Sequence, residues 1–251
     1  MNTITAIGWE LRRILLTRTY LYSLLLIILF SQNALGRLII HGIYGLAPYS
    51  SLSYAQFLVL QNPLLLAVLM LWCAAVFSER ERAVRRIVLA TPITGAGYMA
   101  IKATAIAAAF VFTAGLMVAG SFVFYGRQFG FFNFQEFAGP LAVFTLPPAI
   151  FVLGLSLAAG RWHPRLVHVL IPVIFFTGMM NMRLSPWLDI SANNFLGNYP
   201  RMLMRTLGTG EMIYYLPGNF VASRVALVVA GAALLVWAAV GKNRQTRTLT
   251  D

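Results

Sequence analysis

Six long runs of apolar residues constrain the fold more than any other feature of the sequence. A helix needs roughly 20 mostly apolar residues to cross a hydrocarbon core of about 30 Å. Of the 251 residues, 59% are hydrophobic and only 10% are charged, whereas a soluble domain is about half apolar and a quarter charged. We therefore predict an all-α membrane protein with six transmembrane helices in one domain, residues 1–251. The predicted spans are Thr19 to Ile40, Ala55 to Phe77, Ala103 to Tyr125, Pro140 to Gly160, Leu166 to Met182 and Phe220 to Gly241.

These runs predict helices rather than strands. They are continuous, unlike the alternation of about ten residues that marks a transmembrane β-barrel, and a helix satisfies its own backbone groups in lipid. The first run begins only after Arg18 and continues to about Ile40. That is longer than the apolar core of a cleaved signal peptide, so we interpret it as a retained span.

The basic residues indicate the orientation of the chain. If six spans are assumed, 13 of the 19 Lys and Arg residues lie on one side, five of them around residues 78–102. Cytoplasmic segments carry such an excess. We expect a multi-pass protein of the cell inner or plasma membrane with both termini and residues 78–94 in the cytoplasm. The net charge of +12 then reflects orientation and contact with anionic lipid rather than nucleic-acid binding.

Residues 1–18 predict an amphipathic helix on the membrane surface. Ile7, Leu11, Ile14 and Leu15 recur at helical spacing, and such a pattern before a span is typical of an interfacial helix. Trp9 is a residue type that favours the headgroup level.

The charged segment after the second span predicts a second amphipathic helix. Val84, Ile87 and Val88 share one face, and Glu81 and Arg85 form an i, i+4 pair in the favourable order. An apolar stripe exposed to water predicts a docking surface. The alternative is a solvated run of charges that only enforces topology.

Local signals predict where this helix ends and the next begins. Thr91 precedes Pro92, and a residue before proline is disfavoured in the α region. Thr94 is placed to cap the following helix. Lys102 marks the point where that helix enters the bilayer.

Several stretches together resemble a known family. They are Trp9-Glu10-Leu11-Arg12-Arg13, Glu79-Arg80-Glu81-Arg82, Leu89-Ala90-Thr91-Pro92-Ile93-Thr94 and Lys102. With these stretches and six spans, the chain resembles over its whole length the membrane (permease) subunit of an ATP-binding cassette transporter of the type-2 exporter class.

The resemblance implies a role for each segment. Residues 1–18, with Trp9, Glu10, Arg12 and Arg13, would form an elbow helix. Residues 78–94 would form the coupling helix, which fits a cleft on the nucleotide-binding subunit. The residues implied in that contact are Glu79, Arg80, Glu81, Arg82, Arg85, Arg86, Thr91 and Pro92.

No ATP-binding motif occurs in this chain. The pattern G-x-x-x-x-G-K-[ST] is absent, since Gly241-Lys242 is followed by Asn243 and lacks the upstream glycine. We therefore expect no ATPase activity and no cofactor in this chain. The resemblance implies a separate ATPase subunit that binds ATP and Mg, and a second permease copy or paralogue, giving a homodimer or heterodimer of permeases.

Residues 183–219 form the longest segment between predicted spans, on the external side. Pro200 and Gly208 flank a short stretch in the positions typical of a helix start and end. The resemblance implies an outer gate here, with Arg201, Arg205 and Glu211 as candidates. Solvated surface charge is the alternative.

Four amides predict a polar belt in the outer half of the membrane. Counted at 1.5 Å per residue, Gln32 and Asn33 lie at about the same depth as Gln61 and Asn62. Polar groups inside spans need partners or water, so we hypothesise a translocation path lined by these side chains. An ordinary interhelical hydrogen bond remains the alternative.

Other polar residues suggest little chemistry. Cys73 lies alone inside a span, and His163 and His168 have no carboxylate nearby, so no metal site is expected. Ala222, Ala226 and Ala230 recur every four residues, a spacing that lets helices approach closely.

Two other functions remain open. A membrane-embedded lipid enzyme would need clustered catalytic groups, yet the predicted spans contain no Asp or Glu. A self-sufficient carrier or channel normally has intramembrane carboxylates or an internal repeat. The favoured expectation is a permease for ATP-driven export of a lipid, peptide, drug or similar amphipathic substrate.

Overall fold

The computed structural model describes residues 3–43, 46–89, 93–180, 182, 184–198 and 216–240, apart from the side chains of residues 86 and 89. These residues form helices and no strand. In chain order the elements are α1 (Thr3–Leu15), α2 (Arg18–Ala34), η1 (Leu35–Ile39), α3 (Ser51–Ala75), α4 (Glu79–Leu89), α5 (Gly95–Phe129), η2 (Phe134–Phe137), α6 (Ala138–Pro140), η3 (Leu141–Thr145), α7 (Leu146–Trp162), α8 (Pro164–Met179) and α10 (Gly218–Val240). A further short helix covers residues 193–198.

Five helical stretches in the described part of the chain are long and apolar enough to cross a membrane. They are Arg18–Ile39, Ser51–Ala75, Gly95–Phe129, Phe134–Trp162 and Gly218–Val240. Each contains most of a span predicted from the sequence, and the third is much longer than predicted. The all-helical fold is therefore confirmed.

The fifth predicted span corresponds to α8, which is shorter than the other spans. It has 16 residues, about 24 Å of helix at 1.5 Å per residue, less than the hydrocarbon core of about 30 Å. By length, α8 is therefore not among the five spanning helices, and the six-span layout stays a prediction.

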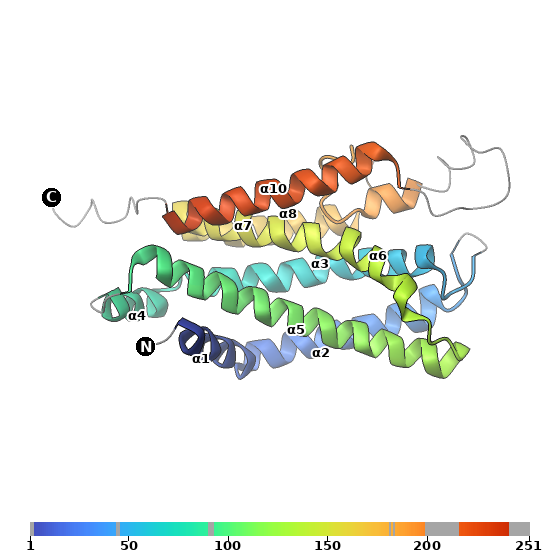
Figure 1. Ribbon diagram of the computed structural model, residues 1–251, viewed down its shortest axis with the longest axis horizontal. Helices are drawn as coiled ribbons and strands as arrows, with labels where there is room; N and C mark the ends of the chain where they lie inside the picture. Colours follow the sequence, from blue (N-terminus) through green and yellow to red (C-terminus); the bar gives the residue numbers. More distant parts are fainter. Residues whose placement is uncertain are drawn as a thin grey trace.

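The long helices lie side by side, with α3 in the middle (Figure 1). On one side α3 packs against α7 and α8, and on the other against α2 and α5. Of its most apolar stretch, 83% is buried, compared with 28% for α10. The core therefore surrounds α3, whereas the outward faces of the other helices are apolar and exposed.

One end of the bundle gathers α1, α4 and the end of α10 (Figure 1). Here α1 packs against α5. Leu11, Ile14 and Leu15 pack against the core, as the amphipathic pattern predicts, while Trp9 stays 66% exposed. We call this the α4 end and the opposite one the loop end.

Hydroxyl side chains start several helices. Thr17 accepts a hydrogen bond from the backbone N–H of Tyr20 (3.1 Å), and Ser50 accepts one from that of Ser53 (3.2 Å). Thr94 caps α5 through the N–H of Gly97 (3.1 Å), so the predicted cap is confirmed. Each satisfies a backbone donor that the first turn leaves free.

Two glycines set the contact between α7 and α10. A Cβ added at Gly231 would lie 2.7 Å from both the carbonyl oxygen of Ile150 and the Cα of Phe151, and Gly154 faces Gly231 from α7. The close approach predicted for the alanines of the last span thus occurs at a glycine. Ala222 and Ala230 are exposed instead.

Stacked aromatic rings close the loop end. Tyr54 of α3 stacks on Phe137 with ring centroids 3.9 Å apart, and Phe122 of α5 stacks on Phe134 at 4.1 Å. Residues 126–137 thus pack as the end of α5, a turn and η2.

Candidate functional site

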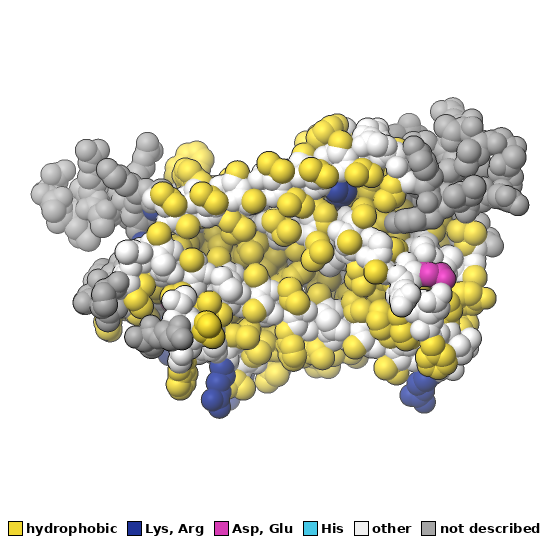
Figure 2. Space-filling model, viewed as in Figure 1, with side chains coloured by type: hydrophobic (Ala, Val, Ile, Leu, Met, Phe, Trp, Pro, Cys, Tyr) yellow, Lys and Arg dark blue, Asp and Glu magenta, His cyan; other side chains and the backbone are white. Residues whose placement is uncertain are grey.

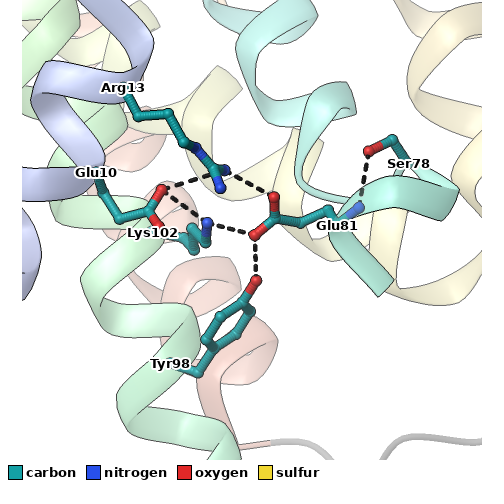
Figure 3. Close-up of polar contacts among 6 residues, drawn as sticks. All are labelled: Glu10, Arg13, Ser78, Glu81, Tyr98 and Lys102. Carbon is teal, nitrogen blue, oxygen red and sulfur yellow. Dashed lines mark hydrogen bonds and ion pairs between the residues drawn. The ribbon is translucent and has the colours of Figure 1, made fainter. Parts of the chain in front are cut away.

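A cluster of charged side chains lies at the α4 end, where three helices meet (Figure 3). Glu10 and Arg13 come from α1, Glu81 from α4, and Tyr98 and Lys102 from α5. Glu81 and Lys102 are only 5% and 3% exposed. Charges that are this buried need partners, and the cluster supplies them.

The carboxylate of Glu81 is the centre of the cluster. One oxygen accepts a hydrogen bond from Arg13 Nη2 at 2.7 Å. The other contacts Lys102 Nζ and accepts a hydrogen bond from the hydroxyl of Tyr98. The backbone N–H of Glu81 donates to Ser78 Oγ at 3.3 Å, which fixes the first turn of α4.

Glu10 completes the cluster. Its carboxylate lies 2.7 Å from Lys102 Nζ and 3.2 Å from Arg13 Nη2. The two carboxylates and two cations alternate, so their charges balance. Lys102 Nζ also lies 5.2 Å from the centre of the Tyr98 ring, within cation–π range.

The partners change the pKa values of two of these groups. Burial by itself would raise the pKa of Glu81, but Lys102, Tyr98 and Arg13 together lower it below its ordinary value. Burial would likewise lower the pKa of Arg13, yet Glu81 and Glu10 raise it. Both groups are therefore held in their charged forms.

This arrangement joins α4 to two other helices through side chains. Since Glu81 contacts Arg13 on α1 and Lys102 on α5, a displacement of α4 must move those helices or break these ion pairs, of which the one with Lys102 is buried. Breaking one partner from a buried pair costs about 3–5 kcal/mol. The cluster thus links α1, α4 and α5 through charged side chains.

Sequence reasoning found part of this cluster. The sequence predicts Glu10 and Arg13 in the elbow helix, Glu81 as a contact for an ATPase subunit, and Lys102 where a span enters the bilayer. It does not predict that they meet, and Tyr98 was missed. A signal existed, because Tyr98 and Lys102 are four residues apart and thus share one face of a helix. Arg85, predicted to pair with Glu81, lies over the Tyr98 ring at 5.9 Å.

The outward face of α4 carries the other predicted contact residues. Glu79, Arg80 and Arg82 are exposed. Of the predicted apolar stripe, Ile87 is 73% exposed, whereas Val88 packs against the core. The exposed stripe is therefore narrower than predicted, because α4 uses part of it to rest on the bundle.

The four amides of the predicted belt lie in different surroundings. Gln32 and Asn33 are exposed on α2, whereas Gln61 and Asn62 are buried in α3. The amide of Gln61 has no hydrogen-bond partner in the described part of the chain. Whether the four line one path stays a prediction.

Asn62 joins three elements. Its amide nitrogen donates to the carbonyl of Phe144 in η3 (2.7 Å) and to that of Ser191 (3.2 Å). Pro148, four residues after Phe144, has no N–H to donate to this carbonyl in the α-helical pattern. Asn62 lies 11 residues into α3, about 16 Å from its start, so residues 184–198 reach back along α3.

A buried arginine holds this returning segment, and sequence reasoning missed its role. Arg224 of α10, only 3% exposed, donates to the carbonyls of Pro186 (3.0 Å), Ile190 (3.0 Å) and Asp189 (2.5 Å). The carboxylate of Asp189, whose pKa is raised by burial, accepts the N–H of Phe195 at 2.8 Å. The sequence did contain a signal for this role. Arg224 lies six residues inside an apolar helix, and a charged side chain there needs polar partners.

Some predicted site residues lie outside the described residues. For the ATPase contact these are the side chain of Arg86, and Thr91 and Pro92 entirely. For the outer gate they are Arg201, Arg205 and Glu211. Arg12 of the predicted elbow helix is described and exposed.

Within the described ranges, no group of three or more His, Cys, Asp and Glu side chains could hold a metal ion. Comparison with models of protein families, with curated proteins and with solved structures finds no match. The class of protein is therefore inferred from the fold. Five apolar helices long enough to cross the bilayer indicate a multi-pass membrane protein.

Proposed function

We propose that the chain is the permease subunit of an ATP-driven exporter of the type-2 ATP-binding cassette class. In this proposal a separate subunit hydrolyses ATP and presses on α4, and the bundle responds by changing access to its substrate path. The substrate would be a lipid, peptide, drug or similar amphipathic molecule. The layout would have six spans, with α8 as a short fifth one, and both termini in the cytoplasm.

The observation that carries the proposal is the charge cluster around Glu81. A segment that only connects two spans needs a few residues, yet α4 is an 11-residue helix. A buried ion pair with Lys102 fixes it to α5, and a pair with the half-exposed Arg13 fixes it to α1. Its outward face leaves Arg80, Arg82 and Ile87 exposed. A rigid lever with a free face is what transmission from a second protein requires.

The belt amides support the proposal in a second way. Gln61 is buried without a partner among the described residues, and such a group is costly inside a membrane. A conformational change or a passing substrate would satisfy it. Gln32 and Asn33, which are exposed in a single chain, would face a second permease copy or paralogue.

Co-purification of an ATPase tests this proposal. The tagged chain, isolated from its own cells, is expected to retain a subunit with ATPase activity. Reversing the charges of exposed α4 residues, Glu79→Arg with Arg80→Glu and Arg82→Glu, should release that subunit without disturbing the buried cluster. Glu136→Lys, an exposed residue at the loop end, is the matched control and should retain it.

Reconstitution supplies the decisive outcome. Vesicles holding the chain and the ATPase subunit should move substrate only with ATP. If the chain alone transported substrate at the same rate without nucleotide, or if the α4 variant kept the ATPase, the proposal would be wrong.

A further inference from the structure

An apolar groove lies on the outer surface of α5 at the loop end. It is lined by Phe122, Val123, Gly126, Arg127, Phe132 and Phe134 and has a volume of about 340 Å³. That volume falls within the range of small-molecule sites, about 300–1,000 Å³. Figure 2 shows hydrophobic side chains and a basic group at the corner of the molecule where α5 ends.

The walls of the groove are held in place by ring contacts. Phe122 and Phe134 stack with their planes 5° apart, and Phe132 meets Phe134 edge-on at 6.3 Å. Phe132 lies against α5 at Gly126, where an added Cβ would be 2.9 Å from the ring and would push it away from the helix. The groove is thus built by the fold rather than left by loose side chains.

Arg127 supplies a positive charge at the rim. Its side chain is exposed, and no carboxylate in the described part of the chain lies within ion-pair distance of it. Glu136, the acidic residue of η2, accepts a hydrogen bond from Asn133 at 2.8 Å instead. The guanidinium is therefore available to an external anion.

The position of the groove along α5 indicates what kind of anion this is. Arg127 lies 25 residues beyond Lys102, about 38 Å along the helix, and a bilayer with its headgroups is about 40–45 Å thick. With Lys102 at one surface, Arg127 lies among the headgroups of the other. Val123, one turn deeper and 60% exposed, faces acyl chains.

We infer that this groove is a binding site for an anionic phospholipid of the leaflet at the loop end. The acyl chain would lie against Val123, Phe122 and Phe132, and the phosphate would accept hydrogen bonds from Arg127. A headgroup without a cation of its own is favoured, because the guanidinium is the local positive charge. This inference does not depend on the proposed export function.

Lipid binding to the purified full-length chain tests the site. Native mass spectrometry with added phosphatidylglycerol or phosphatidylcholine gives the dissociation constant of the first lipid bound. Phosphatidylglycerol should bind more tightly, and Arg127→Gln should weaken it by about fivefold, the size of one basic residue's attraction to anionic lipid. Arg37→Gln, an exposed arginine in η1, should leave it unchanged.

A second variant tests the groove itself. Val123→Trp fills the groove at an exposed position, so it should weaken phosphatidylglycerol binding while the protein keeps its helical circular dichroism. Equal affinity for the two lipids, or equal effects of Arg37→Gln and Arg127→Gln, would overturn the inference. So would displacement of the lipid by millimolar inorganic phosphate, or a dimer that Val123→Trp abolishes, since the occupant would then be phosphate or a second copy.

Discussion

At the residue scale, Glu81 joins α4 to side chains of two other helices. It faces solvent on neither oxygen, because Arg13, Tyr98 and Lys102 surround its carboxylate. Its neighbour Glu79 is exposed on the same helix. Two glutamates two residues apart therefore have different roles, and substitutions can separate them.

Replacing Glu81 should destabilise the protein. Glu81→Gln keeps the shape of the side chain but leaves Lys102 buried without a full counter-charge, which should cost about 3 kcal/mol in the free energy of unfolding. The measurement is unfolding in detergent micelles followed by circular dichroism. Glu79→Gln should change the same quantity by less than about 0.5 kcal/mol, and equal effects of the two would contradict the cluster.

The pH dependence of this contribution follows from the lowered pKa of Glu81. A carboxyl group whose pKa is lower in the folded chain stabilises the fold above its unfolded pKa, which is 4.5, and this stabilisation disappears as the pH falls through the folded pKa. The difference in unfolding free energy between the wild type and Glu81→Gln should be steady near neutral pH and shrink below pH 4.5. If this difference in unfolding free energy instead grew as the pH fell, the pKa of Glu81 would be raised in the folded chain, contrary to the prediction.

At the element scale, close contacts between helices depend on single glycines. Between α7 and α10, Gly154 and Gly231 let the two backbones touch. In α5, by contrast, a Cβ at Gly115 would meet nothing within 4 Å. The same substitution should therefore have opposite effects at the two kinds of position.

Gly231→Ala should destabilise the bundle and Gly115→Ala should stabilise it. The first must push α7 and α10 apart, for which overpacking costs about 1–3 kcal/mol. The second only removes the flexibility of a glycine inside a helix, a gain of about 0.5–1 kcal/mol. The unfolding temperatures of both variants and the wild type, measured in one detergent, test these two expectations. A loss of stability in both variants would refute the assigned α7–α10 contact.

At the scale of the whole molecule, charge separates the two ends of the bundle. The α4 end holds the buried cluster and the exposed Arg80 and Arg82, whereas the loop end is largely aromatic. On the face that Figure 2 shows, hydrophobic side chains cover much of the surface between them. Such a molecule lies across a bilayer with its two ends on opposite sides.

Cysteine labelling tests this orientation. Arg82→Cys and Asn133→Cys place a thiol at exposed positions of the two ends, and the natural Cys73 is buried. A membrane-impermeant maleimide should label residue 133 in intact cells and residue 82 only after permeabilisation. The reverse pattern would invert the orientation, and labelling of both in intact cells would contradict a bundle that spans the membrane.

Local signals in the sequence determined the helices themselves. Spans follow from runs of apolar residues, the start of α5 from the hydroxyl of Thr94, and the amphipathic α1 from side chains three and four residues apart. Each of these depends on neighbours within a few turns of one helix, so no tertiary contact is needed to predict them.

Only the tertiary structure decided which side chains meet. Glu81 contacts Arg13, 68 residues away, Asn62 contacts Ser191, 129 residues away, and Arg224 holds carbonyls more than 30 residues earlier. A pattern within one helix shows which face is polar, but the partner on another helix is chosen by how the bundle packs.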